Sequence, residues 1–255
     1  MARQNSRSMA CGNERAPGTA GASEPGQAAG GSMADRRESS LEIQVFLDFI
    51  CPWCLIGTRN LLAAIQRLAE LRPEIVPSVV WRSVQLLPET PVDGIPYQAF
   101  YVARLGSAEA VAARRARLRQ AGHPAGIAFA FDDIPLLPNT AAAHRLLAYA
   151  CTHEPAEKQT ALVERLLTAF FVDCENIGDP AVLEHIGLEC GLSHDGMCAH
   201  GCVGDGAAVT AVGAVSNDVG AISGVPLMVF NGAHVLEGAH SVDVMVEMII
   251  ESIRH

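Results

Sequence analysis

The sequence is poor in positive charge: Lys158 is its only lysine, and 18 basic residues stand against 28 acidic ones. The net charge of −10 argues against nucleic acid or an anionic membrane surface as the main partner, because both are negatively charged. No apolar run approaches the roughly 20 residues that a membrane-spanning helix needs. The first 40 residues also lack the apolar core of about 7–15 residues found in a secretory signal. We therefore expect a cytoplasmic protein with no nucleic-acid or membrane partner.

The sequence contains one C-x-x-C motif, Cys51-Pro52-Trp53-Cys54, and lacks a second one. This absence helps to decide what the motif does. A C-x-x-C pair begins many zinc modules, but a closed zinc site needs two more ligands at a standard spacing. The other common use of the motif is redox chemistry, and a proline between the cysteines favours it. Eight cysteines in 255 residues do not make a small secreted disulfide scaffold. We interpret the pair as redox-active and expect no metal.

The segment 41–65 predicts a strand, a short turn and a helix. Residues 43–48 form an apolar run typical of a central strand that is covered on both faces. Pro52 suits the first helical position, where its missing N–H costs nothing. Apolar residues then recur at helical spacing and mark a core face: Leu55, Ile56, Leu61, Leu62, Ile65 and Leu68.

This arrangement has a chemical consequence for the two cysteines. Cys51 would lie at the N-terminus of the helix, where free N–H groups and the helix dipole stabilise an anion. The thiolate is the form of cysteine that attacks disulfides. Cys54, one turn further, could then resolve the mixed disulfide.

The strand–CPWC–helix unit, with Gly57 after it, resembles the DsbA-like branch of the thioredoxin superfamily. In such proteins a cis-proline faces the C-x-x-C pair, and Val225-Pro226 matches that position. The segments Asn139-Thr140 and Ala143-His144-Arg145-Leu146 resemble the FrnE-like subgroup, which neighbours the 2-hydroxychromene-2-carboxylate isomerases and the kappa-class glutathione transferases. The resemblance implies an α/β thioredoxin-like fold, in the order β-α-β … α-β-β-α, with an inserted all-helical subdomain.

The expected organisation follows from this resemblance. Residues 1–40, rich in glycine, alanine, serine and charge, should form a disordered N-terminal extension. Residues 41–83 and 203–255 should form the thioredoxin-like domain, and residues 84–202 the helical insertion. Expected strands lie at 74–82, 227–231 and 234–237, and expected helices at 97–105, 107–121, 141–151, 154–173, 181–190, 204–220 and 241–253.

Several features near the expected insertion allow two interpretations. The apolar loop over 122–138 is expected to border the active cleft. Asn139 offers the N-cap of the next helix and is a possible cleft residue. His144 on that helix either faces the cleft as well or is a partly buried histidine bonded to backbone. The basic run Arg114, Arg115, Arg117 and Arg119 is a solvated face or binds an anionic cosubstrate such as glutathione.

A second group of cysteines lies near the end of the insertion. Cys190, Cys198 and Cys202, with His194 and His200, match no standard zinc spacing. Ordinary thiols are the favoured interpretation. A soft metal site and a second redox pair remain open.

The resemblance implies a protein-disulfide oxidoreductase or isomerase with Cys51 and Cys54 as its catalytic residues. Pro52, Trp53, Val225 and Pro226 would support the site, with the backbone at Val225 pairing with an extended substrate. Expected partners are proteins that bear thiols or disulfides. No cofactor is expected, although glutathione or thioredoxin could serve as reductant. The alternative is a glutathione-dependent isomerase or transferase acting on a small aromatic molecule.

Overall fold

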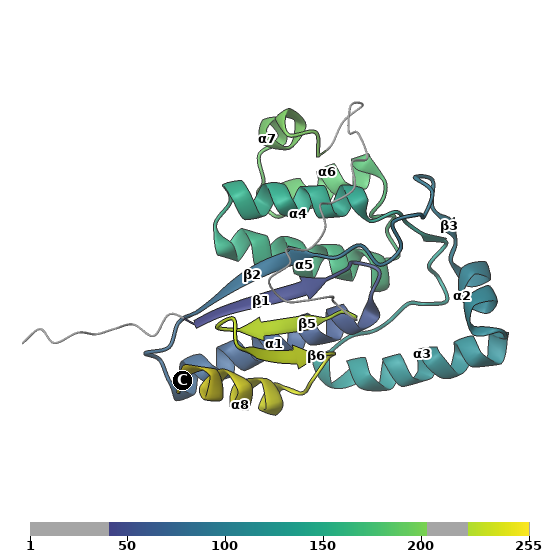
Figure 1. The fold of residues 1–255 in the computed structure, drawn as a ribbon. Helices are drawn as coiled ribbons and strands as arrows, with labels where there is room; N and C mark the ends of the chain where they lie inside the picture. Colours follow the sequence, from purple (N-terminus) through teal and green to yellow (C-terminus); the bar gives the residue numbers. More distant parts are fainter. Residues whose placement is uncertain (1–40, 203–223, 255) are drawn as a thin grey trace, which may run out of the picture. The chain divides into compact units, whose positions relative to one another are not determined.

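The computed structural model describes residues 41–202 and 224–254 (Figure 1). The extension expected over 1–40 and the helix expected over 204–220 lie outside these residues. The central sheet has four strands in the order β2-β1-β5-β6. These are β1 (Leu41–Leu47), β2 (Pro77–Ser83), β5 (Leu227–Phe230) and β6 (His234–Glu237). β1 is parallel to β2 and antiparallel to β5, and β5 is antiparallel to β6.

The strand β1 is the centre of the molecule because its neighbours lie on both edges and helices cover it. Val45 stands opposite Trp81 of β2 and Met228 of β5. Only Glu42 and Gln44 of this strand are not fully buried. Trp81 is buried in the core. β2 is an edge strand that begins at Pro77, where a proline is tolerated because its missing N–H breaks no ladder hydrogen bond.

Two helices pack together against the sheet. The helix α1 (Pro52–Leu71) joins β1 to β2, and α8 (Val242–Ile253) follows the β5–β6 hairpin. Figure 1 shows them side by side. Among the described residues, the elements β1-α1-β2 and β5-β6-α8 follow one another in the predicted order.

Residues 84–202, after β2, are mainly helical. The helices are α2 (Tyr97–Leu105), α3 (Ala108–Gly122), α4 (Ala141–His153), α5 (Ala156–Phe171), α6 (Pro180–Glu189) and α7 (His194–Ala199), with a short 3-10 turn, η1 (His123–Ala125). The strands β3 (Ile95–Pro96) and β4 (Leu136–Leu137) add an antiparallel pair. α4 and α5 pack on each other and on β2. That residues 84–202 form a subdomain of their own stays a prediction.

Side chains cap several of these helices at their N-termini. The Ser107 hydroxyl accepts a hydrogen bond from the Ala110 N–H at 3.1 Å and caps α3. The Asp179 carboxylate accepts from the Ala181 N–H at 2.8 Å and caps α6. Each bond satisfies a backbone donor that has no partner within its helix.

The loop over 122–138 was expected to border the active cleft, and this is wrong. Its aromatic residues are buried in the core, where the rings of Phe129 and Phe131 stack with centroids 4.6 Å apart. Phe171 of α5 meets the Phe129 ring edge-on at 5.7 Å. Burial of these large rings stabilises the loop against α5, and so it does not reach the cleft.

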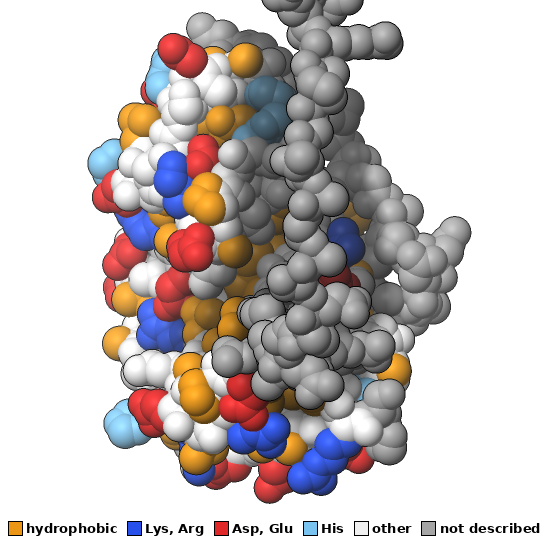
Figure 2. All heavy atoms as spheres, turned by 90° about the vertical axis from the view of Figure 1, so that its left-hand side faces the viewer, with side chains coloured by type: hydrophobic (Ala, Val, Ile, Leu, Met, Phe, Trp, Pro, Cys, Tyr) orange, Lys and Arg blue, Asp and Glu red, His pale blue; other side chains and the backbone are white. Residues whose placement is uncertain are grey.

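The described surface mixes both signs of charge. On the face in Figure 2, acidic, basic and histidine side chains are interspersed with apolar ones wherever described residues are visible. In the described part of the chain, no helix is both long and apolar enough to cross a membrane.

Replacing Leu61 by alanine tests the α1 packing. Leu61 is fully buried in the main core, so Leu61→Ala should lower the free energy of unfolding by about 2–5 kcal/mol, measured by urea denaturation. Leu71→Ala, at a residue on the same helix that is 56% exposed, is the control and should change it far less. Equal losses in both variants would contradict the proposed packing.

Candidate active site

Cys51 lies at the opening of α1, as the sequence predicted. Its backbone is extended, it occupies the N-cap position, and Pro52 is the first helical residue. The Cys51 N–H donates to the Asp48 carbonyl at 3.1 Å, which closes the turn between β1 and α1. Cys51 is 6% exposed and Cys54 is fully buried. Both are present as free thiols.

The two thiols have opposite acidities. The pKa of Cys51 is lowered, chiefly because the Cys54 thiol donates a hydrogen bond to its sulfur, and further by the backbone N–H groups of Cys54 and Trp53. Burial and the charge of Asp48 act in the opposite direction. Burial raises the pKa of Cys54 well above that of a free thiol, and donation to Cys51 raises it further. This order of acidities is the one that a nucleophile at Cys51 and a proton-bearing partner at Cys54 require.

The segment that contains Val225 and Pro226 faces this sulfur. The Val225–Pro226 peptide bond is cis, and the Cys51 thiol lies 3.4 Å from the Val225 carbonyl oxygen. Pro226 packs against α1 at Gly57, where a β-carbon would lie only 2.9 Å from Cγ of the proline. Residues far apart in the sequence thus surround one sulfur atom.

Asp48 was not singled out by the sequence analysis and lies buried beside the site. Its Oδ2 accepts from the Leu86 N–H at 2.7 Å, and its Oδ1 lies 3.2 Å from Nε2 of His144. Neither side chain is exposed to solvent. A carboxylate at the end of an apolar strand, three residues before a reactive cysteine, is the signal that could have identified it.

The two residues expected at the cleft lie elsewhere. His144 is fully buried against Asp48 and the Phe49 ring, so it neither faces the cleft nor bonds to backbone. The Asn139 Oδ1 accepts from the Ala141 N–H at 2.9 Å, and its amide donates to the Thr90 carbonyl at 2.5 Å. The imidazole of His144 therefore contacts the carboxylate of Asp48 in the interior, and the side chain of Asn139 forms hydrogen bonds with backbone groups.

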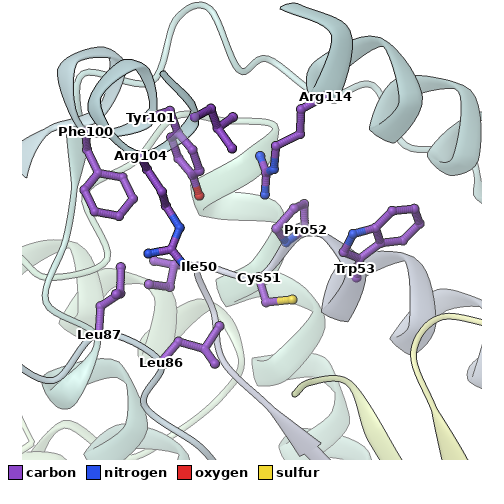
Figure 3. Close-up of a pocket in the computed structure, with 11 residues that line it drawn as sticks. Ile50, Cys51, Pro52, Trp53, Leu86, Leu87, Phe100, Tyr101, Arg104 and Arg114 are labelled. Atoms are coloured by element: carbon purple, nitrogen blue, oxygen red, sulfur yellow. The ribbon is translucent and has the colours of Figure 1, made fainter. Parts of the chain in front are cut away.

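A cavity of about 200 Å³ opens beside Cys51 (Figure 3). Cys51, Pro52 and Trp53 form one side, and α2, α3 and the connection after β2 form the rest. The full lining is Ile50, Cys51, Pro52, Trp53, Leu86, Leu87, Phe100, Tyr101, Arg104, Leu105 and Arg114. Trp53 is 39% exposed at the rim, so it presents an apolar surface next to the nucleophile.

The basic run of α3 divides into three environments. Arg115 and Arg119 bind the Asp132 carboxylate at 2.7 and 2.6 Å, and this pairing, with Arg119 as the main cause, lowers the pKa of Asp132. Arg117 is exposed. Arg114 reaches the cavity, and Arg104 of α2, which the sequence analysis did not single out, joins it there.

The cysteines near α7 are separated from this site. Cys202 is buried, and its thiol lies 3.7 Å from the Arg145 carbonyl. Cys198 is exposed and lies 3.7 Å from the His194 ring, which contacts Glu184. Within the described residues, no three potential metal ligands are grouped closely enough to hold an ion.

Removing the charge of Asp48 should make Cys51 more acidic. The carboxylate raises the pKa of both cysteines, and Asn keeps its shape without the charge. In Asp48→Asn, the pH at which iodoacetamide alkylates Cys51 at half its maximal rate should therefore shift downward. Glu42→Gln, an exposed change on the same strand, should leave it in place. An upward shift in Asp48→Asn would contradict this electrostatic account.

Gly57→Ala should disturb the site without unfolding the protein. The added methyl group would force Pro226 away from α1, and with it the Val225 carbonyl that faces Cys51. We expect slower disulfide exchange while the far-UV circular dichroism stays unchanged. Ala64→Gly, elsewhere on α1, tests for a general helix effect. Full activity in Gly57→Ala would show that the Pro226 contact is dispensable.

Comparison with known proteins places this geometry in context. The profile of a family described as a DSBA-like thioredoxin domain matches residues 42–249. No curated protein matches the sequence. Among solved structures, a probable DsbA oxidoreductase from Streptomyces coelicolor is 24% identical with a TM-score of 0.70, covering 83% of this chain and 89% of its own.

Two further structures have the same fold. A 2-hydroxychromene-2-carboxylate isomerase is 13% identical with a TM-score of 0.54, covering 84% of this chain and 96% of its own. The cytosolic disulfide reductase DsbM from Pseudomonas aeruginosa, solved with GSH, is 16% identical with a TM-score of 0.50, covering 84% and 96%. At these identities the likeness shows the fold alone.

Proposed function

Because the chain belongs to the DsbA-like thioredoxin family, we propose that Cys51 and Cys54 are a redox pair that exchanges disulfides with partner proteins. The observation that carries this proposal is the opposite acidity of two adjacent thiols at the opening of one helix. One thiol of lowered pKa beside one of raised pKa is what stepwise thiol–disulfide exchange requires.

The cycle in the reducing direction has two substitutions at sulfur. The Cys51 thiolate attacks one sulfur of a substrate disulfide, so that a bond forms between Cys51 and that sulfur while the substrate S–S bond breaks. The first substrate thiolate leaves and takes up a proton. The Cys54 sulfur then attacks the Cys51 sulfur and expels the second substrate thiolate, which takes up the Cys54 proton and leaves as a thiol. The substrate gains two electrons, and the enzyme pair becomes a disulfide.

The return step needs a thiol reductant, for which glutathione or a thioredoxin is the proposed class. In a reducing compartment such as the cytoplasm, this supply favours reduction or isomerisation of partner disulfides. An extended substrate segment would bond to the backbone at Val225 as an added strand. The exposed face of Trp53 would provide apolar contact next to the sulfur that reacts.

The second candidate is a glutathione-dependent isomerase or transferase. The fold shared with a 2-hydroxychromene-2-carboxylate isomerase and the cavity beside Cys51 favour it. The buried thiol of Cys54 argues against it, because activation of a cosubstrate thiol does not need a resolving cysteine. A redox pair uses both sulfurs.

An insulin-reduction assay with cysteine variants distinguishes the two functions. Cys51→Ser should abolish activity, because no nucleophile remains, and Cys54→Ser should accumulate a mixed disulfide visible by mass spectrometry. Cys151→Ser, which removes a surface thiol of α4, is the control and should retain activity. Isomerase activity on a small aromatic substrate that survives in Cys51→Ser would refute the redox proposal.

A further inference from the structure

We infer that Arg104 and Arg114 form a carboxylate-binding subsite beside Cys51, which selects disulfides that carry a carboxylate close to the reacting sulfur. This inference rests on the proposed redox function and names its substrate class. Figure 3 shows the two guanidinium groups extending from different helices toward the region of Cys51, Pro52 and Ile50.

Aromatic rings of α2 hold both arginines in place. The Arg114 guanidinium lies 4.7 Å from the centre of the Tyr101 ring, and that of Arg104 lies 5.8 Å from the centre of the Phe100 ring. Stacking of this kind orients a guanidinium. Arg114 also hydrogen-bonds the Tyr101 side chain, and the planar fork of an arginine has further N–H donors for a ligand. The two cations are therefore positioned before a substrate arrives.

Neither arginine has an acidic partner within residues 41–202 and 224–254. Arg115 and Arg119 on the same helix both form ion pairs with Asp132. The arginines of α3 that lie near a carboxylate are therefore paired with it. The protein has ten more acidic than basic residues, yet two guanidinium groups line the cavity unpaired. A planar fork of N–H donors fits a carboxylate, and the cavity is where one could bind.

Activation of the nucleophile does not explain these arginines. The main causes of the lowered Cys51 pKa are Cys54 and the backbone at the start of α1. Tyr101 nevertheless lies within electrostatic reach of both Cys51 and Arg114. Burial is the largest cause of the raised pKa of Tyr101, the charge of Arg114 lowers this pKa, and the charge of Cys51 raises it. The cations are close enough to act on a molecule bound at Cys51 without setting the acidity of the sulfur.

The size of the cavity limits what it can hold. Its volume of about 200 Å³ is below the roughly 300–1,000 Å³ typical of pockets that enclose a whole small ligand. The walls formed by Leu86, Leu87 and Phe100 are apolar. One short arm with an apolar stem and a terminal carboxylate fits, while the rest of the substrate lies outside. Glutathione is a small thiol of this class, because its γ-glutamyl arm carries a carboxylate, next to an ammonium group, at the end of a two-carbon apolar stem.

The test compares two disulfides as oxidants of the reduced full-length protein. Glutathione disulfide carries carboxylates and hydroxyethyl disulfide carries none. The measured quantity is the ratio of their rate constants, followed by acid quenching and mass spectrometry. In Arg104→Gln with Arg114→Gln, this ratio should fall by about 10–100-fold, because charge-assisted hydrogen bonds are lost. Raising the ionic strength should lower the ratio in the unmodified protein and leave it unchanged in the double variant.

Arg117→Gln, an exposed change on α3, is the matched control and should keep the ratio. A ratio that is unchanged in the double variant overturns the subsite, and so does a ratio that falls equally in Arg117→Gln. If the unmodified protein reacts with neither disulfide, nor with insulin, the proposed redox function itself fails.

A peptide disulfide flanked by glutamates, compared with one flanked by glutamines, distinguishes the source of the carboxylate. Arginine dependence with glutathione disulfide supports a small substrate. If the rate depends on the two arginines only with the acidic peptide, carboxylate recognition is supported but the assignment of a small substrate is overturned. Thermal unfolding of each variant, expected at the same midpoint, excludes a folding defect as the cause of a fall.

Discussion

The hydrogen bond from the Cys54 thiol to the Cys51 sulfur is the interaction on which the site depends. It is the largest cause of the lowered Cys51 pKa, and it also raises the pKa of Cys54. The bond requires both sulfurs on the first turn of α1, which β1 and the turn at Asp48 position. Burial of Cys54 excludes water as a competing partner. The lowered pKa of Cys51 and the raised pKa of Cys54 therefore depend on each other.

The buried pair Asp48–His144 places an opposing charge next to this bond. Asp48 disfavours a thiolate at both cysteines, so the acidity of Cys51 reflects a balance rather than a maximum. The same carboxylate holds the Leu86 backbone, and Leu86 lines the cavity. The side chain of Asp48 thus affects the pKa of Cys51 and also fixes the position of Leu86 in the wall of the cavity. His144 contributes from α4, which connects the helical segment to the catalytic turn.

The segment between β2 and β5 gives the site its individual character. Proteins with the same fold include an oxidoreductase, a reductase and an isomerase, so the thioredoxin-like sheet does not decide the substrate. α2 and α3 supply the aromatic and cationic part of the cavity, and the connection after β2 supplies its apolar wall. Sites with different chemistry can be built beside one sulfur by changing these three elements.

The sequence by itself predicted the strand and helix on either side of the C-x-x-C motif, the buried face of α1 and the place of Cys51 at the opening of this helix, because periodicity and helix-start chemistry are local. The positions of Asn139, His144 and the 122–138 loop were not predictable, since their side chains are fixed by Asp48, Thr90 and Phe171 from distant elements. The division of the α3 arginines likewise depended on where Asp132 lies. Tertiary structure alone decided which arginines face the nucleophile, because ion pairs and cavities form between segments that the sequence does not place together.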